Sequence, residues 1–419
     1  MNEKLIEKGY EYAKEYYAEV GVDTETAMKK ADAVPVSLNC WQGDDVIGFD
    51  GVDSLTGGIA TTGNYPGRAR TPEELRADLD ETVSIIPGAL KLNMHASYAE
   101  KGGKIVDRNE YTTDLFQNWI NWCIDKGMGF DFNPTLFSHP MMDGNFSLSS
   151  PKTDVRKFWI DHCKCCRKIA QDAAKQTGMK SVVNYWMPDG YKDIPADTKT
   201  PRDRMIVSLD EIFAEKLDEN LVVEAVESKV FGIGVESYTV ASHEFSLGYA
   251  ISRKKAYCLD TGHFHPTEVV SAKISAVMEY LDRVLLHISR PVRWDSDHVV
   301  IWDEELQHIM DEIIWNGYEN RVHIGLDFFD ASINRIAAWA IGTRNARKAI
   351  LSACLAHAEP AVEAEAEGDY TSRLALLEER KTNPLSAVWD YYCMKKGVPV
   401  GKEWLDEVKR YEKDVLINR

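Results

Sequence analysis

The chain has no long hydrophobic run, little cysteine and a shortage of basic residues. No apolar stretch reaches the ~18 residues of a membrane-spanning helix, so we expect no membrane partner. Its 8 cysteines among 419 residues are too few for the disulfide scaffold of a small secreted protein. The segment Met1-Asn2-Glu3-Lys4 has neither the basic flank nor the apolar stretch of a signal peptide, and we expect a cytoplasmic protein.

Acidic residues outnumber basic ones, with 67 Asp and Glu against 49 Lys and Arg and a net charge of −18. A surface this acidic repels phosphate backbones and anionic lipids, so we expect no nucleic-acid partner. Hydrophobic residues make up 44% of the chain and charged residues 28%, an ordinary balance for a folded protein with a core. This composition excludes disordered and fibrous proteins.

Short apolar runs of strand length alternate with longer helical patterns along the chain. The eight runs cover residues 34–41, 89–96, 127–134, 181–188, 221–229, 256–264, 284–291 and 321–329. Most of them do not alternate between apolar and polar residues, as expected for parallel strands with both faces buried. Eight strand–helix repeats predict an α/β fold, the (β/α)8 TIM barrel. A doubly wound open sheet stays the alternative, because periodicity does not report closure.

Several helix starts are predicted from capping residues. Thr71-Pro72-Glu73-Glu74 combines an N-cap Thr, a Pro at the first helical position and a Glu three residues after the cap. Further starts are predicted at Thr200-Pro201, at Pro266 and at Asp330. The Asp330 carboxylate is expected to cap a helix over residues 331–349.

The ends of the chain carry helical patterns without strand-like runs. Two patterns, at 3–19 and 24–31, precede the first strand, and about three more lie in residues 357–419. We therefore predict a barrel with N-terminal helices over residues 1–356 and a helical C-terminal extension over residues 357–419. The glycine-rich loop at 42–70 follows the first strand, and a loop of that length is typical of an active-site cover.

Ionisable side chains gather at the ends of the last four runs. They are Glu227, Asp260, His263, His287, Asp295, Asp297 and Asp327. In a barrel the strand ends meet on one face, where enzymes of this fold place their sites. Carboxylates packed together there repel one another unless divalent cations neutralise them. Oxygen-rich sets with an occasional His suit Mn²⁺, Mg²⁺ or Co²⁺ better than a closed thiolate zinc site, and this set suffices for two adjacent metals.

Each of these residues also has a simpler interpretation when taken alone. A single carboxylate at a strand end more often caps a helix or pairs with a basic residue. His287 lies inside an apolar run, where a histidine is more often a hydrogen-bonded core residue. His265 competes with His263 as a ligand, and the spacing from Asp260 favours His263. The collective pattern favours the metal site, because the first four strand ends carry no comparable cluster.

The cysteine-rich segment His162-Cys163-Lys164-Cys165-Cys166 lies inside a helical pattern over residues 155–174. It has no second Cys/His pair at zinc-ligand spacing, so we interpret these as structural helix residues. Cys40, Cys258 and Cys354 lie in apolar runs and are interpreted as buried small hydrophobes.

Two further strand-end residues suit a small polyhydroxylated ligand. His95 ends the second run and can hydrogen-bond a hydroxyl group, while Trp186 ends the fourth and can pack on the C–H face of a sugar. Core packing is the alternative for Trp186. These positions favour a small sugar as the ligand.

Six strings in the chain carry a family resemblance. They are NCWQGDD at 39–45, LTGG at 55–58, TGNYPG at 62–67, GHFHPTE at 262–268, SRPVRWDSDH at 289–298 and DFFDAS at 327–332. These strings resemble those of the L-rhamnose isomerase family, and the resemblance runs from the first helix to the C-terminal tail. The chain departs from the family pattern at Ala96-Ser97-Tyr98 and in the cysteine-rich helix.

The resemblance implies a (β/α)8 barrel with a helical extension, assembled as a homotetramer in the cytoplasm. It implies an enzyme that isomerises L-rhamnose to L-rhamnulose in L-rhamnose catabolism. Two divalent ions per subunit are implied, Mn²⁺ or another ion such as Co²⁺, Zn²⁺ or Mg²⁺. A structural metal would bind Glu227, Asp260, His287 and Asp327. A catalytic metal would bind His263, Asp295 and Asp297.

On the same basis, Lys229 and His95 would contact sugar hydroxyls, and Trp186 would form the pocket wall. Asp327, Lys229 and His95 are the implied catalytic residues, with Asp327 and Lys229 positioning the group that moves the hydroxyl proton. We favour a direct 1,2-hydride shift, because the strand ends supply ligands rather than a spare base. An enediol pathway stays open.

Two other functions fit a metal-lined barrel. A barrel endonuclease needs a basic rim for DNA, and a net charge of −18 argues against it. A non-catalytic sugar-binding barrel is the alternative that is not an enzyme, although it does not require so many ligands.

Overall fold

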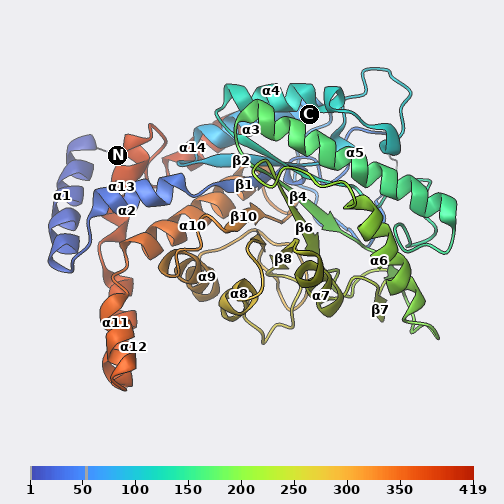
Figure 1. Ribbon diagram of the computed structural model, residues 1–419. Helices are drawn as coiled ribbons and strands as arrows, with labels where there is room; N and C mark the ends of the chain where they lie inside the picture. Colours follow the sequence, from blue (N-terminus) through green and yellow to red (C-terminus); the bar gives the residue numbers. More distant parts are fainter. Residues whose placement is uncertain (1, 52–54) are drawn as a thin grey trace.

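The computed structural model describes residues 2–51 and 55–419, and eight parallel strands in these ranges close into a barrel (Figure 1). They are β1 (Val36–Asn39), β2 (Leu90–His95), β3 (Gly129–Asn133), β4 (Ser181–Trp186), β6 (Val222–Glu227), β8 (Ala256–Asp260), β9 (Val284–Ile288) and β10 (Val322–Leu326). β1 closes the sheet, because Val36 lies opposite Leu90 on one side and Ile324 on the other. The predicted TIM barrel is confirmed, and the open-sheet alternative is wrong.

Each barrel strand is followed by a helix that packs on the outside of the barrel (Figure 1). These helices are α3 (Pro72–Ser84), α4 (Gln117–Asp125), α5 (Thr153–Thr177), α6 (Thr200–Ile212), α7 (His243–Arg253), α8 (Ser271–Met278), α9 (Glu304–Trp315) and α10 (Arg335–Leu355). The strands are almost wholly buried, which explains their continuous apolar runs. A separate antiparallel hairpin, β5 (Gly190–Tyr191) with β7 (Tyr238–Thr239), was not predicted.

Short 3₁₀ helices join several of these elements. They are η1 (Cys40–Gln42), η2 (Ala96–Tyr98), η3 (Arg108–Glu110), η4 (Thr113–Phe116), η5 (Arg380–Thr382) and η6 (Leu416–Asn418).

Of the four predicted helix starts, those at Thr71-Pro72 and Thr200-Pro201 are confirmed and the other two are wrong, although Thr200 is the first residue of α6 and its side chain makes no capping hydrogen bond. Thr71 caps α3, since its side chain accepts a hydrogen bond from the Glu74 N–H. Asp330 does not cap α10, because its carboxylate turns back to the N–H and hydroxyl of Ser332, and Asn334 is the N-cap instead. Pro266 does not open a helix either, because residues 266–270 form a turn before α8.

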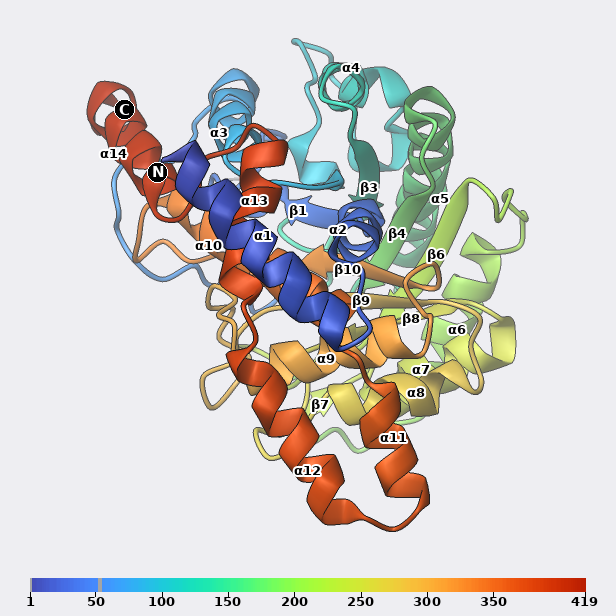
Figure 2. The same cartoon turned by 90° about the vertical axis from the view of Figure 1, so that its left-hand side faces the viewer.

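The chain ends form a helical layer beside the barrel. They contain α1 (Glu3–Glu19), α2 (Thr24–Ala33), α11 (Glu359–Ala366), α12 (Tyr370–Glu379), α13 (Leu385–Lys395) and α14 (Glu403–Asp414). α1 lies along α13, where the rings of Tyr10 and Tyr391 stack with centroids 3.7 Å apart (Figure 2). Residues 357–419 thus hold four α-helices rather than about three. The predicted division at 356/357 falls between α10 and α11 and stays a prediction.

The loop over the barrel mouth is tied to the last strand. The Gln42 side chain exchanges two hydrogen bonds with the Asp330 backbone, of 3.0 and 2.8 Å. Arg335 forms a bidentate ion pair with Asp45 and donates to the Tyr65 carbonyl. These contacts hold the described parts of the predicted 42–70 loop beside the strand ends, while residues 52–54 of that loop lie outside the described ranges. Within the ranges that are described, no helix has the length and apolar character needed to cross a membrane.

The cysteine-rich segment lies on α5, with Cys163 and Cys166 buried and Cys165 half-buried. His162 joins two loops, since its Nδ1–H donates to the Arg108 carbonyl at 2.9 Å and its Nε2 accepts from the Thr135 N–H at 3.2 Å. Among the described residues, none of these cysteines belongs to a group arranged to hold a metal. The geometry agrees with a structural role.

His162 makes the fold sensitive to acid. Burial lowers its pKa from 6.5 to about 3, so the unfolded chain binds a proton in this range that the folded chain does not. Its stabilising contribution is therefore complete above about pH 6.5 and is lost as the pH falls towards about 3.

We predict that His162→Gln reduces the pH slope of the unfolding free energy in that window by up to ~1.4 kcal/mol per pH unit. Urea unfolding at a series of pH values measures the slope. His308→Gln, at an exposed position of α9, is the matched control. An unchanged slope in His162→Gln would contradict the assignment.

Candidate active site

Strand register brings the ionisable side chains together at the carboxyl end of the barrel. Asp260 of β8 lies opposite His287 of β9, and Glu227 ends the neighbouring strand β6. His287 in turn lies opposite Gly325, where a Cβ atom would stand only 3.2 Å from the imidazole ring. The glycine therefore leaves the room that the ring occupies inside the barrel.

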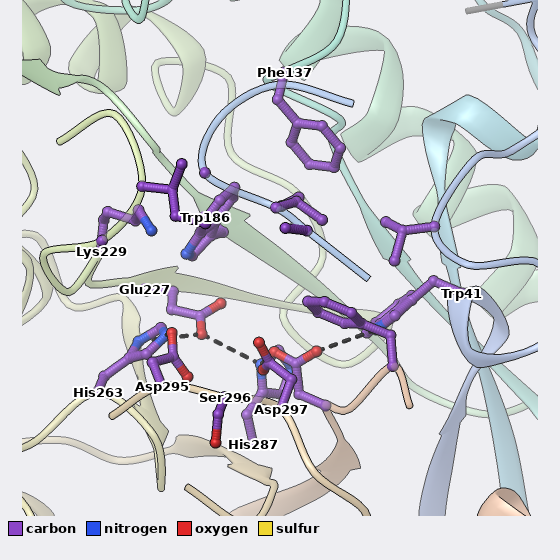
Figure 3. Close-up of a pocket in the computed structure, with 18 of the residues that line it drawn as sticks. Trp41, Phe137, Trp186, Glu227, Lys229, His263, His287, Asp295, Ser296 and Asp297 are labelled. Atoms are coloured by element: carbon purple, nitrogen blue, oxygen red, sulfur yellow. Dashed lines mark hydrogen bonds and ion pairs between the residues drawn. The ribbon is translucent and has the colours of Figure 1, made fainter. Parts of the chain in front are cut away.

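Two sets of side chains each bring together atoms that could bind a metal ion, and we call them the first and second donor groups. The first donor group contains Glu227, Asp260, His287 and Asp327. One ligand atom from each lies within 4.8 Å of the others. The His287 Nδ1 is 3.4 Å from Glu227 Oε1 (Figure 3). The same nitrogen is 3.1 Å from Asp327 Oδ2. These are the four residues that the family resemblance implies for one metal.

The second donor group contains Asp260, His263 and Asp295, again with ligand atoms within 4.8 Å of one another. The His263 Nε2 is 3.3 Å from Asp295 Oδ2. Asp260 therefore belongs to both groups and lies between them. We expected Asp297 beside His263 and Asp295. It lines the same pocket, but among the described residues it belongs to neither donor group.

A tight loop after β9 presents the two aspartates. The backbones of Arg290 and His298 pair across it, and the Ser296 hydroxyl accepts from the Val292 N–H at 2.9 Å. Asp297 has a φ of 48°, in the left-handed region that non-glycine residues seldom adopt. Strain of this kind is held in place at functional sites by the surrounding contacts.

Burial and mutual repulsion perturb the carboxyl groups. Burial raises the pKa of Asp260 well above its ordinary value, and the neighbouring Asp327 adds to this against the opposing effect of His263. Burial and the charge of Asp295 likewise raise the pKa of Asp297. Asp295 is half-buried, and the His263 imidazolium beside it holds its pKa below the ordinary value against the effect of burial. Without a cation, protons must neutralise part of this cluster.

The two imidazoles respond in the opposite way to ordinary buried histidines. Burial alone would lower the pKa of His263, but Asp260 and Asp295 raise it to about 10. The pKa of His287 is also raised, because Cys258, Glu227 and Asp327 outweigh its burial. Each imidazole is therefore surrounded by negative charge.

Several donor atoms of the cluster are buried without a hydrogen-bond partner among the described residues. They are Glu227 Oε1, Asp295 Oδ1, His263 Nδ1, His287 Nδ1 and His287 Nε2. Buried polar atoms are nearly always paired, so convergent unpaired ones require an explanation. Carboxylate oxygens and imidazole nitrogens around a shared Asp260 fit divalent cations.

An aromatic wall faces the donor groups across the pocket (Figure 3). The rings of Trp41, His95, Phe137 and Trp186 follow one another edge to face, with centroid distances of 4.9, 5.7 and 5.7 Å. His95 Nδ1 lies 3.2 Å from the Thr135 hydroxyl oxygen. Burial lowers the pKa of His95 to about 3, so its ring is neutral near neutral pH.

Lys229 lies beside Trp186 in the lining of the same pocket (Figure 3). Its Nζ stands 5.1 Å from the centre of the Trp186 ring. A Cβ atom at Gly58 or Gly232 would come only into ordinary van der Waals contact with that nitrogen, at 3.4 or 3.5 Å. Burial lowers the pKa of Lys229, against the raising effect of Asp295 and Asp297.

Two neutral residues support the site and were not predicted. The Trp41 indole donates to Asp327 Oδ1 at 3.2 Å, and the Asn184 amide donates to Glu227 Oε2. Asn184 precedes Trp186 by two positions on β4, so strand alternation alone would have placed it on the same face. Trp41 stands at the end of the first apolar run, a position equivalent to that of Trp186.

A family model described as L-rhamnose isomerase matches residues 4–419. The chain belongs to the L-rhamnose isomerase family. An L-rhamnose isomerase of Mannheimia succiniciproducens is 58% identical over 415 residues, which are 99% of this chain and 99% of that protein. One from Klebsiella pneumoniae is 55% identical, with the same coverage of both chains. The resemblance carried by the six strings is thus confirmed.

Among solved structures, an L-ribulose 3-epimerase aligns with 80% of this family member and 97% of its own chain. The two share 12% sequence identity and the TM-score is 0.49. This structural similarity is too weak to assign any property of the epimerase to this chain.

We predict that Mn²⁺ raises the melting temperature of metal-free protein and that Asp260→Asn abolishes the rise. At an ion concentration of about 100 times Kd, binding stabilises a folded protein by about 2.7 kcal/mol. Asp260→Asn removes the carboxylate shared by both groups, and it also removes a buried charge, so the metal-free variant should fold. Differential scanning calorimetry makes the measurement. Asp282→Asn, at an exposed position before β9, is the control, and a full Mn²⁺ response in Asp260→Asn would count against the shared-ligand arrangement.

Proposed function

We propose that the chain isomerises L-rhamnose to L-rhamnulose in L-rhamnose catabolism, with two divalent ions per subunit. The observation that carries the proposal is the pair of donor groups sharing Asp260 beneath a pocket with an aromatic wall. Membership of the L-rhamnose isomerase family supports the substrate. The oxygen-rich donor sets suit Mn²⁺, and they also suit Co²⁺, Zn²⁺ or Mg²⁺.

In this proposal Glu227, Asp260, His287 and Asp327 would hold one ion. Asp260, His263 and Asp295 would hold the other, with Asp297 lining the same pocket. Bound divalent ions supply Lewis acidity, which stabilises negative charge on neighbouring sugar oxygens.

The remaining residues orient the sugar. Neutral His95 exchanges a hydrogen bond with a hydroxyl, while Trp186 and Phe137 pack on the C–H face and keep water from the reacting carbons. The Lys229 ammonium, which has no ion-pair partner within 4 Å among the described residues, donates a hydrogen bond to a sugar oxygen near C1 and C2. Asp327, oriented by the Trp41 indole, and Lys229 would together position the group that moves the proton between O1 and O2.

We propose that hydrogen moves directly from C2 to C1 of the sugar. An enediol pathway needs a base that takes a proton from carbon. In this proposal Glu227, Asp260, Asp295 and Asp327 serve as metal ligands instead, so an enediol pathway would have to use Asp297, which lies outside both donor groups. The pocket wall also separates the sugar carbons from solvent.

The hydride shift predicts that L-rhamnose deuterated at C2 gives L-rhamnulose with the deuterium retained at C1. NMR or mass spectrometry of the product measures retention. Chelator treatment should stop turnover, and added Mn²⁺ should restore it. Loss of the label to water would rule out the direct transfer, and sugar binding without turnover would favour a binding module.

Lys229→Met is expected to lower kcat by about 10²–10⁴-fold, the usual range for a group that assists proton movement. The Mn²⁺-induced rise in melting temperature should persist, because Lys229 belongs to neither donor group. Lys199→Met, at an exposed lysine paired with Asp203 on α6, is the control. Loss of Mn²⁺ binding together with activity would show that Lys229 acts on the metal site.

We further propose that the protein is a cytoplasmic homotetramer. The hairpin of α11 and α12 projects from the body (Figure 2) and exposes Val362, Tyr370 and Leu374, and α12 has no buried residue in the part of the chain described. Exposed apolar clusters of this kind mark contacts between proteins. Light scattering should give four times the chain mass of 47.4 kDa.

A further inference from the structure

One cysteine lies directly beneath the donor groups. Cys258 precedes Asp260 by two positions on β8, so both side chains face the barrel interior. Cys258 also lies opposite Glu227 of β6 in the strand register. The thiol is fully buried at this level of the barrel.

The layer below this cysteine is apolar. A small cluster inside the barrel consists of Val182, Val223, Ala225, Ala256, Cys258 and Leu285. Of these six residues, Cys258 alone has an atom that can ligate a metal. It therefore forms the boundary between the apolar barrel interior and the carboxylates above. An apolar side chain would fill the same space. The Cys258 sulfur can therefore bind a metal ion in addition to packing against the barrel interior.

The thiol is within coordinating reach of two residues of the first donor group. Cys258 Sγ, a carboxylate oxygen of Glu227 and an imidazole nitrogen of His287 all lie within 4.8 Å of one another. In a tetrahedral site with metal–ligand bonds of ~2.0–2.3 Å, the ligand atoms are ~3.3–3.8 Å apart. Small side-chain rotations would therefore bring the three ligand atoms to these separations. Glu227 Oε1 and both His287 nitrogens lack hydrogen-bond partners among the described residues, and these side chains are 2% exposed.

We infer that Glu227, Cys258 and His287 form a further metal position, an alternative to the first donor group that is selective for thiophilic divalent ions such as Cd²⁺ and Zn²⁺. Thiolate favours soft ions, whereas the oxygen-rich group above suits Mn²⁺. When the metal–sulfur bond forms, the S–H bond breaks and its proton leaves to solvent, with no change of oxidation state. Because Glu227 and His287 serve both positions, an ion on Cys258 excludes Mn²⁺ from the first donor group.

The inference goes beyond the proposed isomerisation, although it shares two donors with the proposed metal centre. The test therefore measures metal binding rather than turnover. Metal-free protein is titrated with Cd²⁺, and the ultraviolet charge-transfer band of a cadmium–thiolate bond is followed. Wild type should show the band with one Cd²⁺ per chain, and Cys258→Ala and Cys258→Ser should lose it. Cys123→Ala, at a buried cysteine on α4, is the matched control and should keep the band.

Competition provides the second readout. Cd²⁺ should release bound Mn²⁺, which is detected as free aqueous ion by electron paramagnetic resonance. The ratio of Cd²⁺ to Mn²⁺ affinity should fall at least about tenfold in Cys258→Ala. A band that persists in Cys258→Ala, or an unchanged affinity ratio, would overturn the inference.

Circular dichroism checks that the variants fold, and Cys258→Ser keeps nearly the volume of the native side chain. X-ray absorption at the cadmium edge of the wild-type protein needs no variant. One sulfur neighbour supports the inference, and a shell of oxygen and nitrogen alone overturns it. Turnover of L-rhamnose with Mn²⁺ but no cadmium–thiolate band would reject the Cys258 position only. The band without any turnover would reject the proposed isomerisation only.

Discussion

Repulsion among buried carboxylates at the carboxyl end of the barrel is the constraint on which the rest of the structure depends. Glu227 and Asp260 end β6 and β8, and Asp327 directly follows β10, so the closed barrel holds the three carboxylates together. Two imidazoles and hydrogen bonds from Trp41 and Asn184 offset only part of the charge. Burial, together with the charges of Asp327 and Glu227, therefore raises the pKa of Asp260. A cluster of this kind is stable in a folded protein when cations share it, and Asp260 lies where both donor groups meet.

The sequence predicted the parts of this arrangement that leave a pattern along the chain. Eight apolar runs identified the barrel strands, because buried parallel strands lack alternation, and charged strand ends identified the donor residues. The register between neighbouring strands leaves no such pattern along the chain. The sharing of Asp260 between the groups, and the position of Asp297 outside both, follow from which strands are neighbours and from the backbone of the loop after β9. The spacing of residues within one strand cannot report either.

The sequence also failed to identify the neutral residues that support the site. Trp41 and Asn184 have no charge that would mark them in a sequence, although they orient Asp327 and Glu227. Asp330 was misassigned because the same carboxylate satisfies a local turn at Ser332 as readily as a helix end. Cys258 was interpreted from its apolar neighbours, and only the packed barrel shows the donors above it. The net charge of −18 belongs mainly to the surface, since two divalent ions would offset only four of these charges.

The central claim is that two cations share Asp260 at the end of the barrel. Anomalous diffraction from crystals grown with Mn²⁺ tests it most directly. The account predicts two anomalous peaks per chain, one among Glu227, Asp260, His287 and Asp327 and the other among Asp260, His263 and Asp295, with the Asp260 carboxylate between them. A single peak, or peaks that Asp260 does not contact, from a protein that isomerises L-rhamnose would contradict it.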